Sequence, residues 1–342
     1  MDLLPSEDQR ELIAAATDFL QARMPIEDIR ARDGQTSAVD LAAWREGAEL
    51  GLLTLGLPEE HGGSGRFLDD EVLLFATLAE QLASGPFLAS SLAARVAAQC
   101  GDLDLTGRIG DGSALVGLAE LRGDGSIGPD GVKGTFDLID CVGASHVLIV
   151  TESGAAIIDL AEFSDVETLE SADPGTRLST ATVTAATVRH WLPSVTDSIW
   201  QRGVVLSAAS LAGVANAVTR LSTEHAKVRI QFGRPIGVHQ AIKHACADMA
   251  VASDAAMSQT LFAAACIQSD REDARFHSLA AKAVASRAAI DNAAATIQVH
   301  GGMGYTYEHN AHLFLKRAHV FSHLFGEPTH VLAELLEQGA PL

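Results

Sequence analysis

The chain has 342 residues, of which 47% are hydrophobic and 20% are charged, and its formal net charge is −20. This composition predicts a large buried core and excludes an intrinsically disordered protein. The negative charge disfavours nucleic acid as a partner, because a phosphate backbone would be repelled. A small anionic ligand stays compatible, since it needs only a local cluster of cations or backbone N–H groups.

We expect a cytoplasmic protein that does not associate with membranes. We also expect no apolar run of the roughly 18–20 residues that a spanning helix needs. The start, "MDLLPSEDQRELIAAATDFLQ", lacks the basic and then apolar segments of a signal peptide. The cysteines are scattered without CxxC spacing, which predicts reduced thiols and no metal site. They are Cys100, Cys141, Cys246 and Cys266.

The pattern of apolar residues divides the chain into three zones. Residues 1–115 are helical in pattern, with Leu12, Ala16 and Leu20 at helical spacing. Residues 116–194 are rich in Val, Ile, Thr and Gly with short alternations, which predicts a small antiparallel sheet or barrel. Residues 195–342 are helical again and contain long alanine-rich stretches. We therefore predict an α+β chain with a helical domain, a β domain and a second helical domain.

Two glycine-containing segments stand out in the last zone. One is "RIQFGRPIGVHQ", which begins at Arg229, and the other is "QVHGGMGYTYE", which contains Gly301 and Gly302. Arginine offers a planar fork of donors that suits a phosphate, and glycine lets a ligand approach the backbone closely. Taken singly, each is a weak signal, because two glycines after a helix are more often a plain helix end. Neither has the strand–GxGxxG–helix arrangement of a nicotinamide-binding fold.

Together, these segments resemble the acyl-CoA dehydrogenase family. "RIQFGRPIG" is similar to the family's R-x-x-F-G segment, "QVHGGMGY" to its Q-x-x-G-G-x-G segment, and "LGLPEEHGGSG" to one of its N-terminal loops. The order of the three zones also matches the family fold. The resemblance implies a helical N-terminal domain, a central β-barrel and a C-terminal four-helix bundle.

The resemblance also implies FAD as the cofactor. In the family, paired subunits share a flavin, and these two segments hold the diphosphate and adenosine half of a cofactor bound mainly by the neighbouring subunit. The residues that match this role are Arg229, Phe232, Gln240, Gln298, Gly301 and Gly302.

The residues expected around the flavin ring match less well. The family's T-E-P-x-x-G-S loop has no clear counterpart in "GLAELRGDGSIG". Its G-x-K-x-W-I-T strand aligns loosely with "GTFDLID", which places Leu138 at the aromatic position and Asp140 at the hydroxyl position. A carboxylate there would be unfavourable beside a reduced flavin, which carries negative charge.

The catalytic base of the family also has no counterpart. The reaction needs a carboxylate to take the α-proton of the substrate. Ungapped counting from Gln298 places Phe325 at the usual glutamate position, and an alternative position on the helix before R-x-x-F-G falls at Gly203. Glu327 comes two residues late, and His323 is interpreted as a structural or surface histidine.

These departures leave three functional hypotheses. The leading one is a non-catalytic subunit of an FAD-dependent acyl-CoA dehydrogenase, resembling the base-lacking chain of α2β2 enzymes that act on steroid-type CoA thioesters. Its partners would be a catalytic acyl-CoA dehydrogenase subunit, the acyl-CoA substrate and an electron-transfer flavoprotein as acceptor. The second is a self-sufficient homo-oligomer with a relocated base, for which Glu327 and Glu120 are the candidates. The third is a family member without redox chemistry that binds a CoA ester or a partner chain. The sequence does not identify the acyl group.

Overall fold

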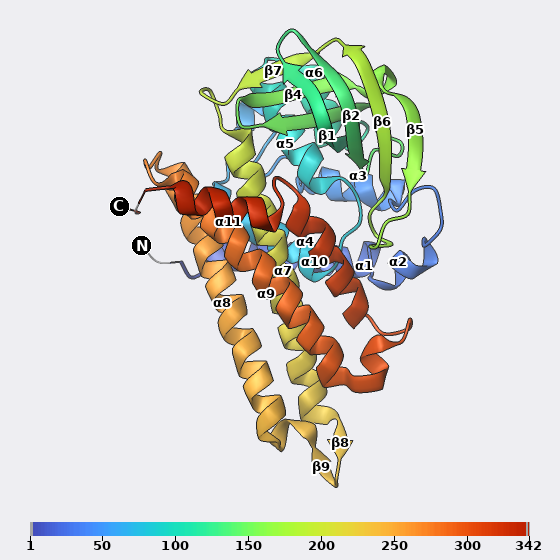
Figure 1. Ribbon diagram of the computed structural model, residues 1–342, viewed down its shortest axis with the longest axis vertical. Coiled ribbons are helices and arrows are strands. Elements are labelled where there is room, and N and C mark those ends of the chain that lie inside the picture. Colours follow the sequence, from blue (N-terminus) through green and yellow to red (C-terminus); the bar gives the residue numbers. More distant parts are fainter. Residues whose placement is uncertain (1–2, 340, 342) are drawn as a thin grey trace. The chain divides into compact units, whose positions relative to one another are not determined.

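The computed structural model describes residues 3–339 and 341. Its contacts divide the chain into two compact units, which we call the helical unit and the sheet unit. The helical unit comprises Met1–Asp18, Val72–Ala83 and Val204–Leu342, and the sheet unit comprises Phe19–Glu71 and Ser84–Gly203. Figure 1 shows the long helices of the first unit and the curved sheet of the second.

The sheet unit is built on one seven-stranded sheet with the strand order β5-β6-β2-β1-β3-β4-β7. Neighbouring strands are antiparallel except for β1 and β3, which run parallel. The strands are β1 (Val116–Gly128), β2 (Gly131–Ile139), β3 (His146–Thr151), β4 (Gly154–Asp159), β5 (Ser164–Leu169), β6 (Leu178–Ala186) and β7 (His190–Pro193). Within the described residues no hydrogen-bonded ladder joins the two edge strands, β5 and β7, so the sheet is open. The expectation of a closed β-barrel was therefore wrong.

Burial on both faces explains the apolar runs of the central strands. β3 and β4 are almost continuously buried, whereas β2 alternates and turns Val132, Phe136 and Leu138 inward. Helix α5 (Phe87–Gln99) packs against β1, β3, β4 and β7 and is itself buried along most of its length. The other helices of this unit are α2 (Glu27–Ala31), α3 (Leu41–Glu49), η1 (Glu59–His61), α6 (Leu103–Gly110) and η2 (Leu160–Glu162).

The helical unit is centred on α9, which packs against α8, α10 and α11. The alanine-rich sequence of α9 permits this, because small side chains let neighbouring helices approach on several sides. The helices of the unit are α1 (Glu7–Arg23), α4 (Leu68–Glu80), α7 (Ile199–Val228), α8 (Gln240–Gln268), α9 (Ala274–His300), α10 (Ala311–His323) and α11 (Pro328–Glu337), of which α1, α4 and α7 extend into the sheet unit. Its short elements are β8 (Ile230–Gln231), β9 (Arg234–Pro235), η3 (Ile236–Val238) and η4 (Gly301–Tyr305).

Two of these helices are long and apolar enough to cross a membrane, which corrects the expectation that no segment meets this criterion. They are α7 and α8, and the most apolar window of α7 is 78% buried inside the protein. A core helix passes the same test, so α7 is explained by its packing. The corresponding window of α8 is only 39% buried, so this helix keeps much of its apolar surface exposed.

The order of a helical, a strand and a helical region follows the prediction. The exact boundaries, 1–115, 116–194 and 195–342, stay a prediction.

Candidate functional site

The two glycine-containing segments lie at the same end of the helical unit. The first follows α7 and forms the β8–β9 hairpin, and the second follows α9 and forms η4. A small buried cluster of Ala226, Ile236 and Val299 joins the ends of α7, η3 and α9. The amide of Ile236 also donates to the carbonyl of Arg229 at 2.8 Å. Residues that are more than 60 positions apart in sequence therefore share one end of the bundle, which Figure 1 shows beside the hairpin.

The hairpin presents an aromatic ring to solvent. Phe232 and Gly233 are its two central residues, and both have positive φ angles, 52° and 77°. This is the geometry of the tight turns that fit the twist of a hairpin. Phe232 is 89% exposed. Its ring lies edge-on to the ring of His239, with 6.2 Å between the centroids.

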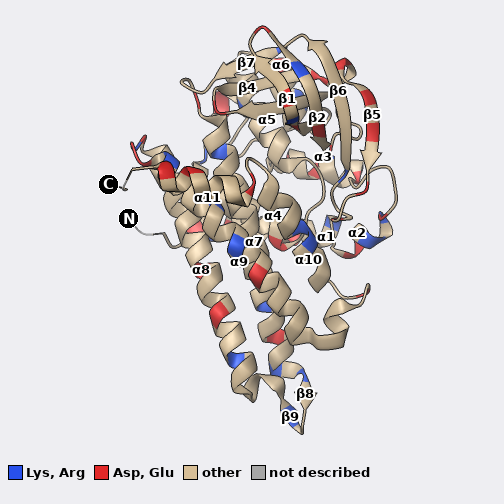
Figure 2. Cartoon of the chain, viewed as in Figure 1, with Lys and Arg blue, Asp and Glu red and all other residues tan. Residues whose placement is uncertain are grey.

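Three polar side chains around this turn are exposed and have no hydrogen-bond or ion-pair partner in the described part of the chain. They are Arg229, Gln240 and Gln298. A Cβ placed on Gly301 or on Gly302 would meet nothing within 4 Å, so the backbone there faces open space. Basic residues surround the hairpin in Figure 2. We call Arg229, Phe232, Gln240, Gln298, Gly301 and Gly302 the tail site.

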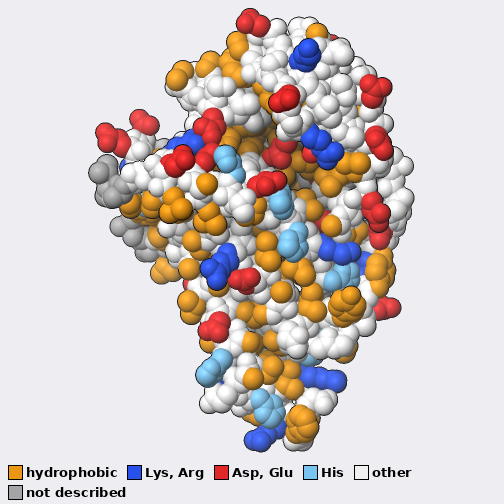
Figure 3. All heavy atoms as spheres, viewed as in Figure 1, with side chains coloured by type: hydrophobic (Ala, Val, Ile, Leu, Met, Phe, Trp, Pro, Cys, Tyr) orange, Lys and Arg blue, Asp and Glu red, His pale blue; other side chains and the backbone are white. Residues whose placement is uncertain are grey.

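A stack of three histidines lies between the two segments. The ring centroids of His225 and His300 are 4.1 Å apart, and those of His300 and His309 are 4.5 Å apart. Burial lowers the pKa of His225 below its usual value, and repulsion from His300, Arg229 and His309 lowers it further. Figure 3 shows histidine, basic and apolar side chains gathered at this end of the helical unit. Sequence reasoning did not identify this histidine stack.

The tail site fits the diphosphate and adenosine half of a dinucleotide. An unpaired guanidinium suits a phosphate, an exposed aromatic ring suits a base, and open glycine backbone allows close approach. The carboxamides of Gln240 and Gln298 supply further donors and acceptors.

The residues aligned with the flavin-ring contacts have structural roles in the sheet unit. Leu138 is 1% exposed in the sheet core. The carboxylate of Asp140 accepts a hydrogen bond from the amide of Arg177 at 2.8 Å, which fastens the end of β2 to the chain before β6. The segment "GLAELRGDGSIG" forms most of β1, with an irregularity between Arg122 and Gly125, rather than a loop.

The turn at the usual base position is filled by an apolar side chain. Phe325 lies between α10 and α11 with φ at 58°, and only 6% of it is exposed. Nearby, the fully buried ammonium of Lys282 donates to the carbonyl of Phe321 at 2.7 Å and to the hydroxyl of Ser207 at 3.0 Å. These bonds tie the end of α10 to α9 and α7. Glu327 and His323, on either side of the turn, are exposed.

The alternative base position lies beside a buried ion pair that sequence reasoning missed. Gly203 is buried on α7, and the guanidinium of its neighbour Arg202 donates to the carboxylate of Glu71. Burial raises the pKa of Glu71, and Arg202 opposes that shift. A glutamate at the start of the apolar stretch "EVLLFATLA" was the available signal. Because Arg202 holds this carboxylate, we do not assign it as a base. Glu120, the other candidate, is half-buried on β1 opposite Asp137.

Two further polar clusters are explained by structure. Cys266, Asp273 and His277 have the spacing of metal ligands, but the guanidinium of Arg271 holds both carboxylate oxygens of Asp273 at 2.7 and 2.8 Å, so we assign no metal.

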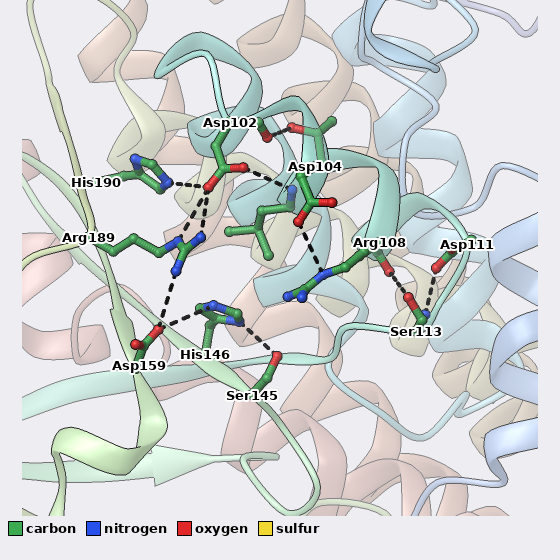
Figure 4. Close-up of polar contacts among 12 residues, drawn as sticks. Asp102, Asp104, Arg108, Asp111, Ser113, Ser145, His146, Asp159, Arg189 and His190 are labelled. Atoms are coloured by element: carbon green, nitrogen blue, oxygen red, sulfur yellow. Dashed lines mark hydrogen bonds and ion pairs between the residues drawn. The ribbon is translucent and has the colours of Figure 1, made fainter.

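The second cluster joins α6 to the sheet and is drawn in Figure 4. Asp102 contacts His190 at 2.7 Å and Arg189 at 3.2 Å, and Asp159 contacts His146 at 3.3 Å. The pKa of Asp102 is lowered to about 2, first by the hydrogen bond from the amide of Leu105 and then by His190 and Arg189.

Comparison with known proteins places the fold in a family. The acyl-CoA dehydrogenase N-terminal domain matches residues 6–107 and the C-terminal domain matches residues 199–336. The acyl-CoA dehydrogenase IpdE2 of Mycobacterium tuberculosis is 30% identical over 97% of this chain and 98% of its own length.

Two similar solved structures are "Tcur3481-Tcur3483 steroid ACAD G363A variant" (25% identity, TM-score 0.87, 97% of each chain) and the ChsE4-ChsE5 complex of Mycobacterium tuberculosis (24% identity, TM-score 0.85, 99% of this chain and 100% of that chain). The family fold, apart from the closed barrel, and the FAD cofactor implied by the sequence resemblance are thereby confirmed. The chain belongs to the acyl-CoA dehydrogenase family.

Proposed function

We propose that this chain is a subunit of an FAD-dependent acyl-CoA dehydrogenase and that it completes a flavin site on a partner subunit without supplying the base. The observation that carries the proposal is the contrast inside the helical unit. The tail site is exposed, with Arg229 unpaired among the described residues, whereas the usual base position is a buried Phe325. A chain that holds the cofactor tail but has no base at that position suits a shared active site.

Two observations support a second chain as the partner. Each of the two similar solved structures, Tcur3481-Tcur3483 and ChsE4-ChsE5, is named for two different chains together. In addition, α8 has a row of exposed apolar residues, Ala247, Val251 and Ala255, and Val251 is 71% exposed. Each is four residues from the next, so all three lie on one side of the helix. An exposed apolar stripe on a long helix favours cover by another chain. We propose an α2β2 heterotetramer with a catalytic acyl-CoA dehydrogenase subunit.

The four side chains of the tail site have separate roles in this proposal. Bound FAD supplies the hydride acceptor for the β-carbon of an acyl-CoA thioester. Arg229 binds its diphosphate, Phe232 stacks on its adenine, and Gln240 and Gln298 orient the tail through hydrogen bonds. The carboxylate that takes the α-proton lies on the partner.

The substrate class proposed is a bulky, steroid-type acyl-CoA thioester. The similarity to the Tcur3481-Tcur3483 steroid ACAD supports this class. Electrons would pass to an electron-transfer flavoprotein.

Co-expression tests the proposal. The chain is produced alone and together with acyl-CoA dehydrogenase chains that carry the base glutamate, and flavin content and acyl-CoA oxidation are measured for each preparation. We expect flavin and activity only in a complex, and activity lost when the partner's glutamate is changed to glutamine. Turnover by this chain alone, abolished by Glu327→Gln or Glu120→Gln, would instead establish the self-sufficient enzyme.

A further inference from the structure

The histidine stack of His225, His300 and His309 joins the two segments of the tail site. His225 lies on the last turn of α7, four residues before Arg229, and His300 is the last residue of α9, directly before Gly301. The Nδ1–H of His300 donates to the carbonyl of Thr296, 2.8 Å away. A neutral His300 ring therefore carries its one proton on Nδ1, and its Nε2 is able to accept a second proton. His309 accepts from the amide of Ala311 at 3.1 Å.

The charges that act on His225 are positive in the described part of the chain, and Glu308, which precedes His309, is exposed. His225 is influenced by His300, by His309 and by Arg229, and no carboxylate contributes among the described residues. Glu224 is adjacent in sequence, but its carboxylate is bonded to the ammonium of Lys227 at 2.6 Å. On the neighbouring elements, His239 faces Phe232, and His312 is bonded to the carbonyl of Tyr307 at 3.2 Å.

Rings this close do not readily carry charge. Two imidazolium ions about 4 Å apart repel each other strongly, and partial burial removes the water that would screen them. In the ligand-free chain the neutral form of His225 is therefore favoured, in keeping with its lowered pKa. A bound anion would reverse this preference, because a nearby negative charge favours the protonated ring.

We propose that the histidine stack takes up a proton from solvent when the diphosphate of an adenine nucleotide binds beside Arg229, so that pH controls how tightly the chain holds the cofactor tail. This inference rests on the proposed function, because it assigns the diphosphate of the shared FAD as the anion. His225, His300 and His309 are positioning and charge-tuning residues of that site.

The linkage has a defined sign and size. A site that binds one more proton with ligand than without it gains affinity as pH falls, by at most about tenfold per pH unit. Affinity begins to rise when the pH falls to the point at which the ligand-bound stack protonates. It stops rising once the pH is low enough to protonate the ligand-free stack as well. We expect binding to strengthen about three- to tenfold as pH is lowered through the range in which the ligand-bound stack takes up its proton.

Calorimetry on the intact chain tests the proposal. ADP is titrated into the protein in buffers of different ionisation enthalpy, and the slope of the observed enthalpy gives the number of protons taken up. Inorganic pyrophosphate is titrated as the minimal probe. FAD and coenzyme A both carry an adenosine diphosphate, so coenzyme A is titrated in parallel.

Two histidine variants serve as test and control. His225→Gln removes a ring of the stack, and His319→Gln removes an exposed histidine on α10 outside it. If His225→Gln does not fold, His309→Gln is the second test variant. His309 is half-buried and lies on the loop after η4. Thermal melting and circular dichroism check each fold.

We expect proton uptake with ADP and with pyrophosphate, its loss in His225→Gln or His309→Gln, and no change in His319→Gln. ADP binding without proton uptake would overturn the inference, as would uptake that survives both stack variants. Uptake with coenzyme A alone would place the site on the substrate's nucleotide and overturn the assignment to FAD. The flavin content of the complex is measured separately, so a flavin-loaded complex whose binding ignores pH refutes this inference and leaves the proposed function standing.

Discussion

The helical unit contains two turns with almost the same sequence, Phe232-Gly233-Arg234-Pro235 and Phe325-Gly326-Glu327-Pro328. In both, the phenylalanine has a positive φ angle, 52° in the first and 58° in the second. The environments differ completely, because Phe232 is 89% exposed and Phe325 is 6% exposed.

The difference between the two turns indicates that the buried Phe325 serves the stability of the fold and the exposed Phe232 serves binding. A phenylalanine in left-handed backbone is uncommon, and a conformation of this kind persists only where its surroundings over-determine it. Packing in the core explains Phe325. No comparable packing holds Phe232 within the described chain, which favours a bound molecule or a partner as the reason for its position. We therefore expect changes at the first turn to alter flavin retention and changes at the second to alter stability.

The largest effect is expected when the buried ring is removed. Phe325→Ala should lower the free energy of unfolding by about 3–5 kcal/mol, because it leaves a cavity. Phe232→Ala, the matched control, should change stability by less than about 0.5 kcal/mol, as exposed substitutions usually do, and should weaken flavin retention in the complex. Chemical denaturation of both variants measures the difference, and equal destabilisation would remove the distinction between the two turns.

The next largest effect concerns Arg229. Arg229→Gln should weaken binding of the cofactor tail by about 1.5–3 kcal/mol, roughly 10- to 150-fold, since a charge-assisted hydrogen bond is lost. The readout is the flavin released from the complex on dilution, measured by fluorescence. Arg287→Gln, an exposed arginine on α9, is the control and should release no additional flavin. Similar flavin loss from both variants would indicate a general charge effect.

A smaller effect is expected at Asp102 in the sheet unit. Asp102→Asn should cost about 1–2 kcal/mol of stability at pH 7, because the contacts with His190 and Arg189 lose their charge. The pKa of Asp102 is lowered from 3.8 to about 2, so this carboxylate stabilises the fold above about pH 4 and ceases to do so as pH falls toward 2. Wild type and variant should therefore converge in acid while flavin retention stays equal. Curves that stay parallel down to pH 2 would contradict this account.

The smallest effect on stability is expected at Gly302. A Cβ there meets nothing within 4 Å, so Gly302→Ala should change the free energy of unfolding by less than about 0.5 kcal/mol. The same methyl group would occupy the space offered to the diphosphate and should weaken ADP binding, which calorimetry measures. Unchanged ADP affinity in a folded variant would show that the ligand does not approach this backbone.

Local patterns predicted the features that depend on local sequence. The helical spacing of Leu12, Ala16 and Leu20 lies in α1, and the strand alternations lie in the sheet. The two glycine segments were identifiable only together, through their resemblance to two segments of one family, because two glycines after a helix are more often a plain helix end. Phe325 was identified by counting from Gln298, and the structure adds that its side chain is buried.

Features that depend on tertiary contacts could not be predicted. The open sheet depends on whether β5 and β7 pair, which strand patterns do not encode. The pairing of Glu71 with Arg202 and the stacking of His225 on His300 join residues more than 70 positions apart. The membrane criterion was misjudged because it depends on the mean hydropathy of a window, which single polar residues do not interrupt, and both α7 and α8 contain such a window.

The central claim is that this chain contributes half of a flavin site. The most direct test is the flavin-to-protein ratio, read from the visible absorbance spectrum of the chain purified alone and of the chain purified with a base-carrying partner. The account predicts little or no flavin in the chain alone and stoichiometric flavin in the complex. Close to one flavin per chain in the protein purified alone would contradict it.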